Sequence, residues 1–186
     1  MKKNYQLGTI LSVVGFLTGL LIMYLMASIY NPTIEGKILD GRPDEAITVR
    51  IVFALLGWIG ITGGAKKQEW AWFLGLIAAT MQILSGFFAI IPPASIGLPF
   101  PTIWVFLIAF ALWFGMLFIG DVEKKVIGVA FISGLAYVLT YMDGVGAISR
   151  LQTVQESFPN AMYTMAQMLN WWGAIAWAVF IFALVK

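Results

Sequence analysis

The chain has 186 residues, of which 61% are apolar and 11% are charged, and its formal net charge is +2. A soluble protein of this size would have too few polar groups to cover its surface. The composition therefore favours a membrane protein, for which lipid is the apolar solvent. The small charge argues against a nucleic-acid partner. Histidine and cysteine are both absent from the sequence. We therefore expect no disulfide, no thiol chemistry and no cofactor bound by His or Cys.

Six apolar segments approach the roughly 20 residues that a transmembrane helix needs. In chain order, we expect spans at about residues 7–30, 46–64, 69–91, 102–120, 125–142 and 161–185. Asn31-Pro32 ends the first segment, and a proline-rich stretch over 92–101 separates the third from the fourth. The sequence therefore predicts an all-α fold, a polytopic integral membrane bundle of six transmembrane helices. By length it is a single domain over residues 1–186.

The basic residues predict how this bundle is oriented. If the N-terminus lies in the cytoplasm, six spans return the C-terminus to the same side. Seven basic residues then lie inside: Lys2, Lys3, Lys66, Lys67, Lys124, Lys125 and Lys186. Four lie outside: Lys37, Arg42, Arg50 and Arg150. Because cytoplasmic loops carry an excess of Lys and Arg, this distribution favours an N-in/C-in topology, and we expect a prokaryotic plasma membrane.

Glycines spaced four residues apart occur in two of the predicted spans. Gly15 and Gly19 form one such pair, and Gly60 and Gly64 form another. Small residues at this spacing allow two helix backbones to approach closely, so we expect these positions to lie at helix contacts. The pattern is common in membrane helices and does not identify a homodimer.

Arg50 is the most costly charge in the chain, because it lies about one turn inside the second predicted span. Its side chain can extend to the headgroups, which is the ordinary explanation. The functional alternative is an outer polar cluster of Arg50, Asp143 and Arg150, or an anionic ligand bound by Arg50. Asp143 is predicted to end the fifth span on the same side, and the last loop is predicted to open at Asp143-Gly144.

Neutral polar residues recur within the predicted spans, at Gln82, Tyr137, Gln167 and Asn170. Such residues usually form hydrogen bonds between helices, and the alternative is a polar path for a small molecule. No acidic residue lies deep in any span, which argues against a carboxylate-based proton or sodium relay.

Aromatic residues cluster near the predicted span boundaries. Trp72 follows an inner turn and Trp104 follows an outer loop, so anchoring at the membrane interface explains both without a ligand. The loop over residues 144–158 carries apolar residues at helical spacing. It is predicted to form a short amphipathic surface helix or to serve as a plain connector.

Gly120-Asp121 resembles part of the aspartate motif of prepilin peptidases, but Phe118 stands where that motif has glycine. The sequence also lacks the usual metal ligands, acids deep in the spans and nucleotide motifs, so we expect no catalysis by the chain alone. A membrane enzyme that uses Asp143 or Asp121 is the third hypothesis, behind the two that follow. The leading hypothesis is a non-catalytic integral subunit that binds other integral membrane subunits and lipids. A respiratory or other energy-converting complex is the commonest host for such a subunit. The alternative is a small transporter or channel for a small solute, with Arg50 as the binding residue if the solute is an anion. Lipid or quinone binding has no motif to support it. In size and hydropathy alone, the chain is similar to small hydrophobic subunits of prokaryotic terminal oxidases.

Overall fold

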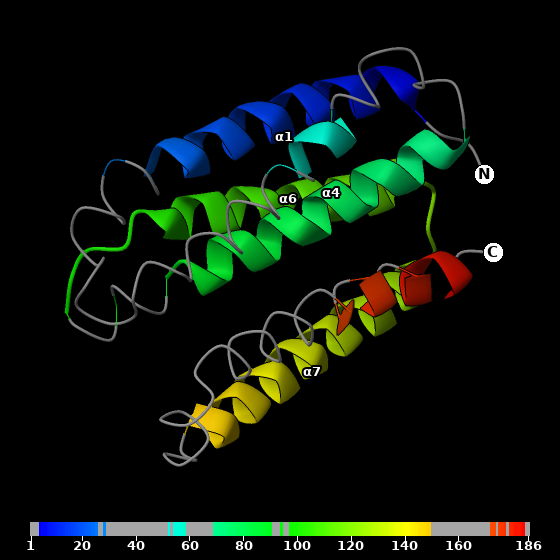
Figure 1. Cartoon of the computed structure of the whole chain (residues 1–186). Coiled ribbons are helices and arrows are strands. Elements are labelled where there is room, and N and C mark those ends of the chain that lie inside the picture. The colour runs from blue at the N-terminus through cyan, green and yellow to red at the C-terminus, as the bar shows by residue number, and fades with distance from the viewer. Residues whose placement is uncertain are drawn as a thin grey trace. The chain divides into compact units, whose positions relative to one another are not determined.

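The structure, a computed structural model, is all-helical, as the sequence predicts. Its helices are α1 (Tyr5–Leu25), α4 (Glu69–Phe88), α6 (Thr102–Ile119) and α7 (Lys124–Ser149) (Figure 1). Residues 54–58 are also helical, and an apolar helix at Ile175–Leu184 lies near the C-terminus. The structure describes residues 4–25, 28, 52, 54–58, 69–90, 94, 97–149, 172–173, 175–177 and 179–184. No strand occurs among these residues.

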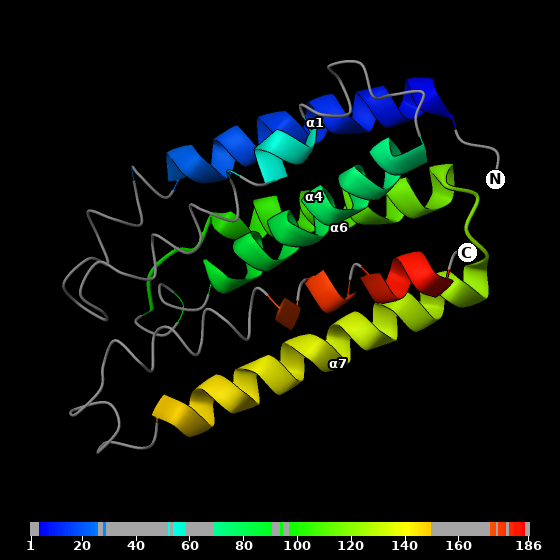
Figure 2. The same ribbon diagram turned by 45° about the vertical axis from the view of Figure 1, so that its right-hand side comes forward.

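The chain divides into two compact units, Met1–Val122 and Glu123–Lys186. In the first unit α6 contacts both α4 and α1, and the three helices run alongside one another in two views (Figures 1 and 2). In the second unit the C-terminal helix lies beside α7 (Figure 2). The single domain over residues 1–186 stays a prediction.

Among the residues that the structure describes, two helices are long and apolar enough to cross a membrane. Gln6–Leu25 has a mean hydropathy of 2.0, and Thr102–Ile119 has a mean hydropathy of 2.4. Trp72–Phe87 and Ile175–Leu184 are shorter apolar helices. Most of the predicted span at 46–64 lies outside the described residues. The two long helices support membrane association, and the six-span topology stays a prediction.

The helix that contains the predicted fifth span is longer than expected. We expected it to end at about residue 142, with a loop opening at Asp143-Gly144, but α7 continues to Ser149. That expectation was wrong because it relied on the turn preference of an Asp-Gly pair. A glycine inside a helix costs only about 1 kcal/mol relative to alanine, which the continued backbone hydrogen bonds can offset. Six residues assigned to the surface connector, 144–149, therefore belong to α7.

The C-terminus of α6 has an unusual residue in a common cap. The N–H of Val122 donates to the carbonyl of Leu117, and the N–H of Asp121 donates to the carbonyl of Phe118. This is the Schellman pattern, in which glycine usually occupies the left-handed position. Here Asp121 takes that position with φ 57°, whereas Gly120 has an ordinary φ of −74°. Gly120 is therefore needed for a reason other than its backbone freedom.

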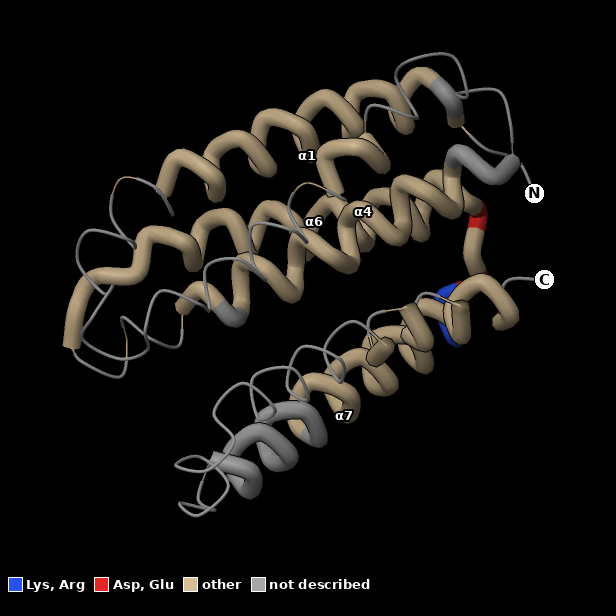
Figure 3. Tube along the Cα trace, in the orientation of Figure 1, with Lys and Arg blue, Asp and Glu red and all other residues tan. Residues whose placement is uncertain are grey.

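The charged residues whose side chains are described lie in one part of the chain. Figure 3 shows acidic and basic residues in the connection after α6 and at the start of α7. These are Asp121, Glu123, Lys124 and Lys125, and all four are exposed. The sequences of α1 and α6 contain no charged residue. The apolar surface of these two helices is thus uninterrupted by charge along its length.

Candidate functional site

A buried amide joins three helical segments in the first unit. Gln82 of α4 is 0% exposed. The indole N–H of Trp58 donates to Gln82 Oε1 at 2.8 Å, and Gln82 Nε2 donates to the backbone carbonyl of Gly15 in α1 at 3.1 Å. Both ends of the amide are therefore bonded, one to the helical residues 54–58 and the other to α1.

This junction of Trp58, Gln82 and Gly15 is suited to holding helices together. An amide left unpaired in an apolar interior would cost about 2–7 kcal/mol, so the bonds are needed wherever the amide is buried. Amide and indole groups neither titrate near neutral pH nor act as ordinary nucleophiles. The junction therefore offers no acid, base or nucleophile for catalysis.

The buried hydroxyl groups of α1 and α4 are bonded within their own helices. Each donates to the carbonyl four residues earlier, which occurs at Ser12, Thr18, Thr80 and Ser85. Thr102 differs, because its buried hydroxyl has no hydrogen-bond partner within the described part of the chain. The four bonded hydroxyls are consequently not directed at a ligand.

Trp72 is an interior residue, which corrects the prediction that it anchors the membrane interface. Its side chain is buried, and its indole N–H donates to the carbonyl of Met116 in α6 at 2.5 Å. The ring occupies the space beside Gly120, where a Cβ would lie 2.6 Å from ring atoms. Gly120 therefore provides room for Trp72. Trp104, by contrast, is 65% exposed. Position near a span end did not distinguish these two tryptophans.

The second unit contains a similar contact. Trp177 is buried, and its indole N–H donates to the carbonyl of Ala130 in α7 at 2.9 Å. Its ring lies directly against Gly134, and the ring of Tyr137 lies against Gly173 of the C-terminal segment. Aromatic rings facing glycines therefore pack the C-terminal segment onto α7.

Aromatic rings also line α6. Phe106, Phe110, Phe114 and Phe118 follow at four-residue intervals, with successive ring centroids 5.7, 5.2 and 6.4 Å apart. Phe87 of α4 lies 5.7 Å from Phe106. The spacing of residues on a helix surface accounts for this row. Its phenyl rings carry no donor or acceptor that would fix the headgroup of a quinone.

Several residues singled out from the sequence fall outside the described residues. These are Arg50, Arg150, Gln167, Asn170, Gly60 and Gly64. Asp143 lies within α7, but its side chain is not described. The outer polar cluster of Arg50, Asp143 and Arg150 therefore stays a prediction.

The other predicted positions are described. A Cβ at Gly15 would overlap the ring of Trp58, and one at Gly19 would lie 2.6 Å from Leu55. Tyr137 is half-buried. Sequence reasoning missed the bonded tryptophans, Trp58 and Trp177. A signal was present, since both lie well inside predicted spans, away from the interface where tryptophan is usual.

Within the described residues, no group of three acidic, histidine or cysteine side chains could hold a metal ion. Comparison with family models, with curated proteins and with solved structures gives no match. Functional interpretation thus depends on the chemistry of the chain itself.

Proposed function

We propose that the chain is a non-catalytic integral membrane subunit that packs against larger subunits of a membrane assembly. A respiratory or other energy-converting complex is the proposed host. The observation that carries the proposal is the bonding of Gln82, the fully buried amide of α4. The most polar group described in the interior of the first unit joins helices at both of its ends. An interior of this kind is expected of a scaffold.

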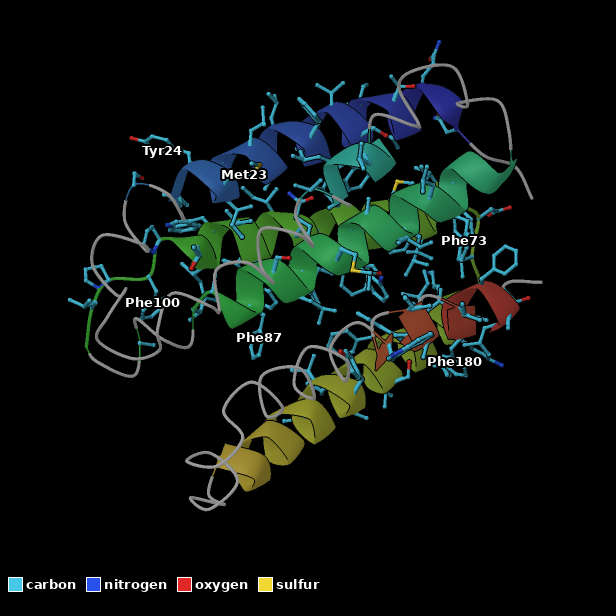
Figure 4. All side chains as sticks on the ribbon, in the orientation of Figure 1. Met23, Tyr24, Phe73, Phe87, Phe100 and Phe180 are labelled. Carbon is cyan, nitrogen blue, oxygen red and sulfur yellow. The ribbon has the colours of Figure 1, made fainter. Side chains whose placement is uncertain are left out.

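The apolar outer surface supports placement among lipids or other helices. Large exposed apolar side chains line α1: Leu7, Ile10, Val13, Val14, Leu17, Leu20, Leu21 and Tyr24. Figure 4 shows Tyr24 pointing away from its helix, and its side chain is 67% exposed. Apolar patches of this extent are unusual on soluble monomers and common where lipid or a partner covers them.

The proposal includes six spans, with both termini in the cytoplasm of a prokaryote. Because the chain has no cysteine, single cysteines can report this topology. We expect Lys125→Cys to be protected from a membrane-impermeant thiol reagent in intact cells. Arg42→Cys should be labelled. Labelling of Lys125→Cys with protection of Arg42→Cys would contradict the orientation, and labelling of both would contradict the number of spans between them.

The subunit role is tested by gentle detergent extraction from the native membrane, native gel separation and mass spectrometry. We expect fixed stoichiometry with larger, cofactor-bearing chains. Migration as the 20.5 kDa chain alone, or as a simple multiple of it, would overturn the proposal. The environment of Gln82 does not support the alternative, a small transporter. A residue bonded to two neighbouring segments at 0% exposure does not line a solute path.

A further inference from the structure

Side-chain N–H groups join neighbouring helices by the same local arrangement in three places within the described residues. Each group donates to a backbone carbonyl of another helix, and the residue four positions after that carbonyl is glycine. The donor, acceptor and glycine are Trp72, Met116 and Gly120; Trp177, Ala130 and Gly134; and Gln82, Gly15 and Gly19. We refer to these as the glycine-opened carbonyl sites.

Helix geometry explains why the glycine matters. A helical carbonyl points toward the N–H four residues later, and the side chain of that later residue covers the oxygen from one side. Glycine leaves the second lone pair of the oxygen open. A Cβ at Gly120 would lie 2.6 Å from Trp72 Nε1, which is the donor atom itself. A Cβ at Gly19 would be in ordinary contact with Gln82 Nε2, at 3.7 Å, and its tight contact would be with Leu55, at 2.6 Å.

At Met116 the extra bond does not require the helix to give up its own. The carbonyl of Met116 accepts from the N–H of Gly120 at 3.1 Å in addition to the indole of Trp72. The carbonyl of Ala130 accepts from the hydroxyl of Ser133 at 2.8 Å in addition to Trp177. The second bond is therefore gained at a carbonyl that already has a local partner.

We propose that the glycine-opened carbonyl sites select which helices become neighbours and fix their register. Lipid tails are as apolar as the helix surfaces, so apolar burial alone discriminates weakly between partners in a membrane. Each of these three donors is satisfied in the register that places it opposite a carbonyl four residues before a glycine. Sliding the helices by one turn would leave an indole or amide N–H unpaired in apolar surroundings. This role belongs to the chain itself, whatever its partner subunits are.

The donor is tested by Trp72→Phe and Trp177→Phe, which keep an aromatic ring and remove the N–H. The full-length chain is unfolded by SDS titration in mixed micelles. We expect each variant to lower the ratio of folded to unfolded chain about three- to eighteen-fold, which corresponds to the average and the largest hydrogen bond measured between membrane helices. Trp104→Phe is the matched control, since that indole is exposed, and should change the ratio less than about two-fold. Equal effects at all three positions would overturn the proposal.

The acceptor is tested by Gly120→Ala, with ¹H–¹⁵N spectra of the tryptophan indoles. The Trp72 resonance is assigned by its loss in Trp72→Phe. We expect this indole to lose its protection from hydrogen exchange in Gly120→Ala while the Trp177 indole keeps its own. Gly128→Ala on α7 is the control, because nothing lies within 4 Å of a Cβ there. A protected Trp72 indole in a destabilised Gly120→Ala chain would mean that the glycine provides only space.

Register is measured with pairs of cysteines in the otherwise cysteine-free chain. Phe87 and Phe106 are in ring contact between α4 and α6, and Phe110 lies one turn farther along. We expect oxidation to link Phe87→Cys to Phe106→Cys in preference to Phe110→Cys, and Trp72→Phe to reduce this preference severalfold. An unchanged preference would overturn the proposal, even if Gly120→Ala fails to fold.

Discussion

Within the first unit, α4 carries the most buried polar side chains and is the most deeply buried helix, whereas α6, the most apolar helix, is more exposed. In α4, which carries Thr80, Gln82 and Ser85, no described side chain is exposed. In the apolar windows of α1 and α6, 33% and 39% of the residues are buried. A soluble protein would show the opposite order, because water rewards the burial of its most apolar helix. The difference teaches that apolar character does not predict burial within the first unit, and that its interior helix is the one whose buried amide bonds to its neighbours.

The largest effect should come from the interior helix. Gln82→Ala removes most of a buried side chain and leaves the indole of Trp58 without the acceptor observed at 2.8 Å. The cavity and the unpaired donor should together lower the free energy of unfolding by about 3–5 kcal/mol. SDS titration in micelles measures this loss. Leu17→Ala on the exposed face of α1 should cost far less, and equal losses at both positions would remove the contrast between the two helices.

A charge introduced on the exposed face of α1 should test whether that face contacts lipid. Leu17 is 59% exposed, near the middle of α1. If this face contacts lipid, Leu17→Asp should oppose membrane insertion by about 3 kcal/mol. On a water-facing helix the same change would be nearly neutral. Insertion is measured as the fraction of newly made chain that resists alkaline extraction from the membrane. Leu17→Phe is the control, and full insertion of Leu17→Asp would contradict a lipid-facing α1.

The close approach of α4 to α6 should make one glycine irreplaceable. A Cβ at Gly86 would lie 2.8 Å from the backbone nitrogen of Phe106, and backbone atoms move aside less readily than a side chain. Gly86→Ala should therefore lower the free energy of unfolding by about 1–3 kcal/mol. Gly128→Ala faces open space and should raise it by up to about 1 kcal/mol through helix propensity. A stabilised Gly86→Ala chain would show that the two backbones are farther apart.

Composition and the length of the apolar segments were sufficient to predict the all-helical class, because a helix satisfies the hydrogen bonds of its own backbone in any apolar surroundings. They were not sufficient for side-chain roles. Trp72 and Trp104 both lie near predicted span ends, yet only Trp72 has Gly120 and the Met116 carbonyl opposite it. That pairing depends on residues about 44–48 positions away in the chain. Periodicity within one helix carries no information about what faces it from another helix.

The end of α7 shows the same limit for local rules. Asp143-Gly144 has the composition of a turn, but α7 continues through it to Ser149. The turn propensity of a residue pair is a weak predictor. A long helix accommodates a glycine at a cost of about 1 kcal/mol relative to alanine. At Gly120-Asp121 the helix does end, but the glycine is not the residue with positive φ. A glycine near a helix end indicates a boundary only when the packing around it leaves that glycine free to serve the cap.

The smallest expected effect lies at that cap. Asp121 holds φ 57°, a conformation that glycine adopts without the steric cost that a Cβ brings. Its side chain is exposed, so little packing is lost on substitution. Asp121→Gly should therefore raise the free energy of unfolding by about 0.5–1 kcal/mol, measured by the same SDS titration. Asp121→Ala keeps the Cβ and should give no gain. If Asp121→Gly destabilises the chain instead, the aspartate contributes a contact that outweighs its backbone strain. Residue 120 must stay glycine to leave room for the ring of Trp72. Exchanging residues 120 and 121 would therefore place glycine at the left-handed position of the cap, but it would also disrupt the packing of Trp72.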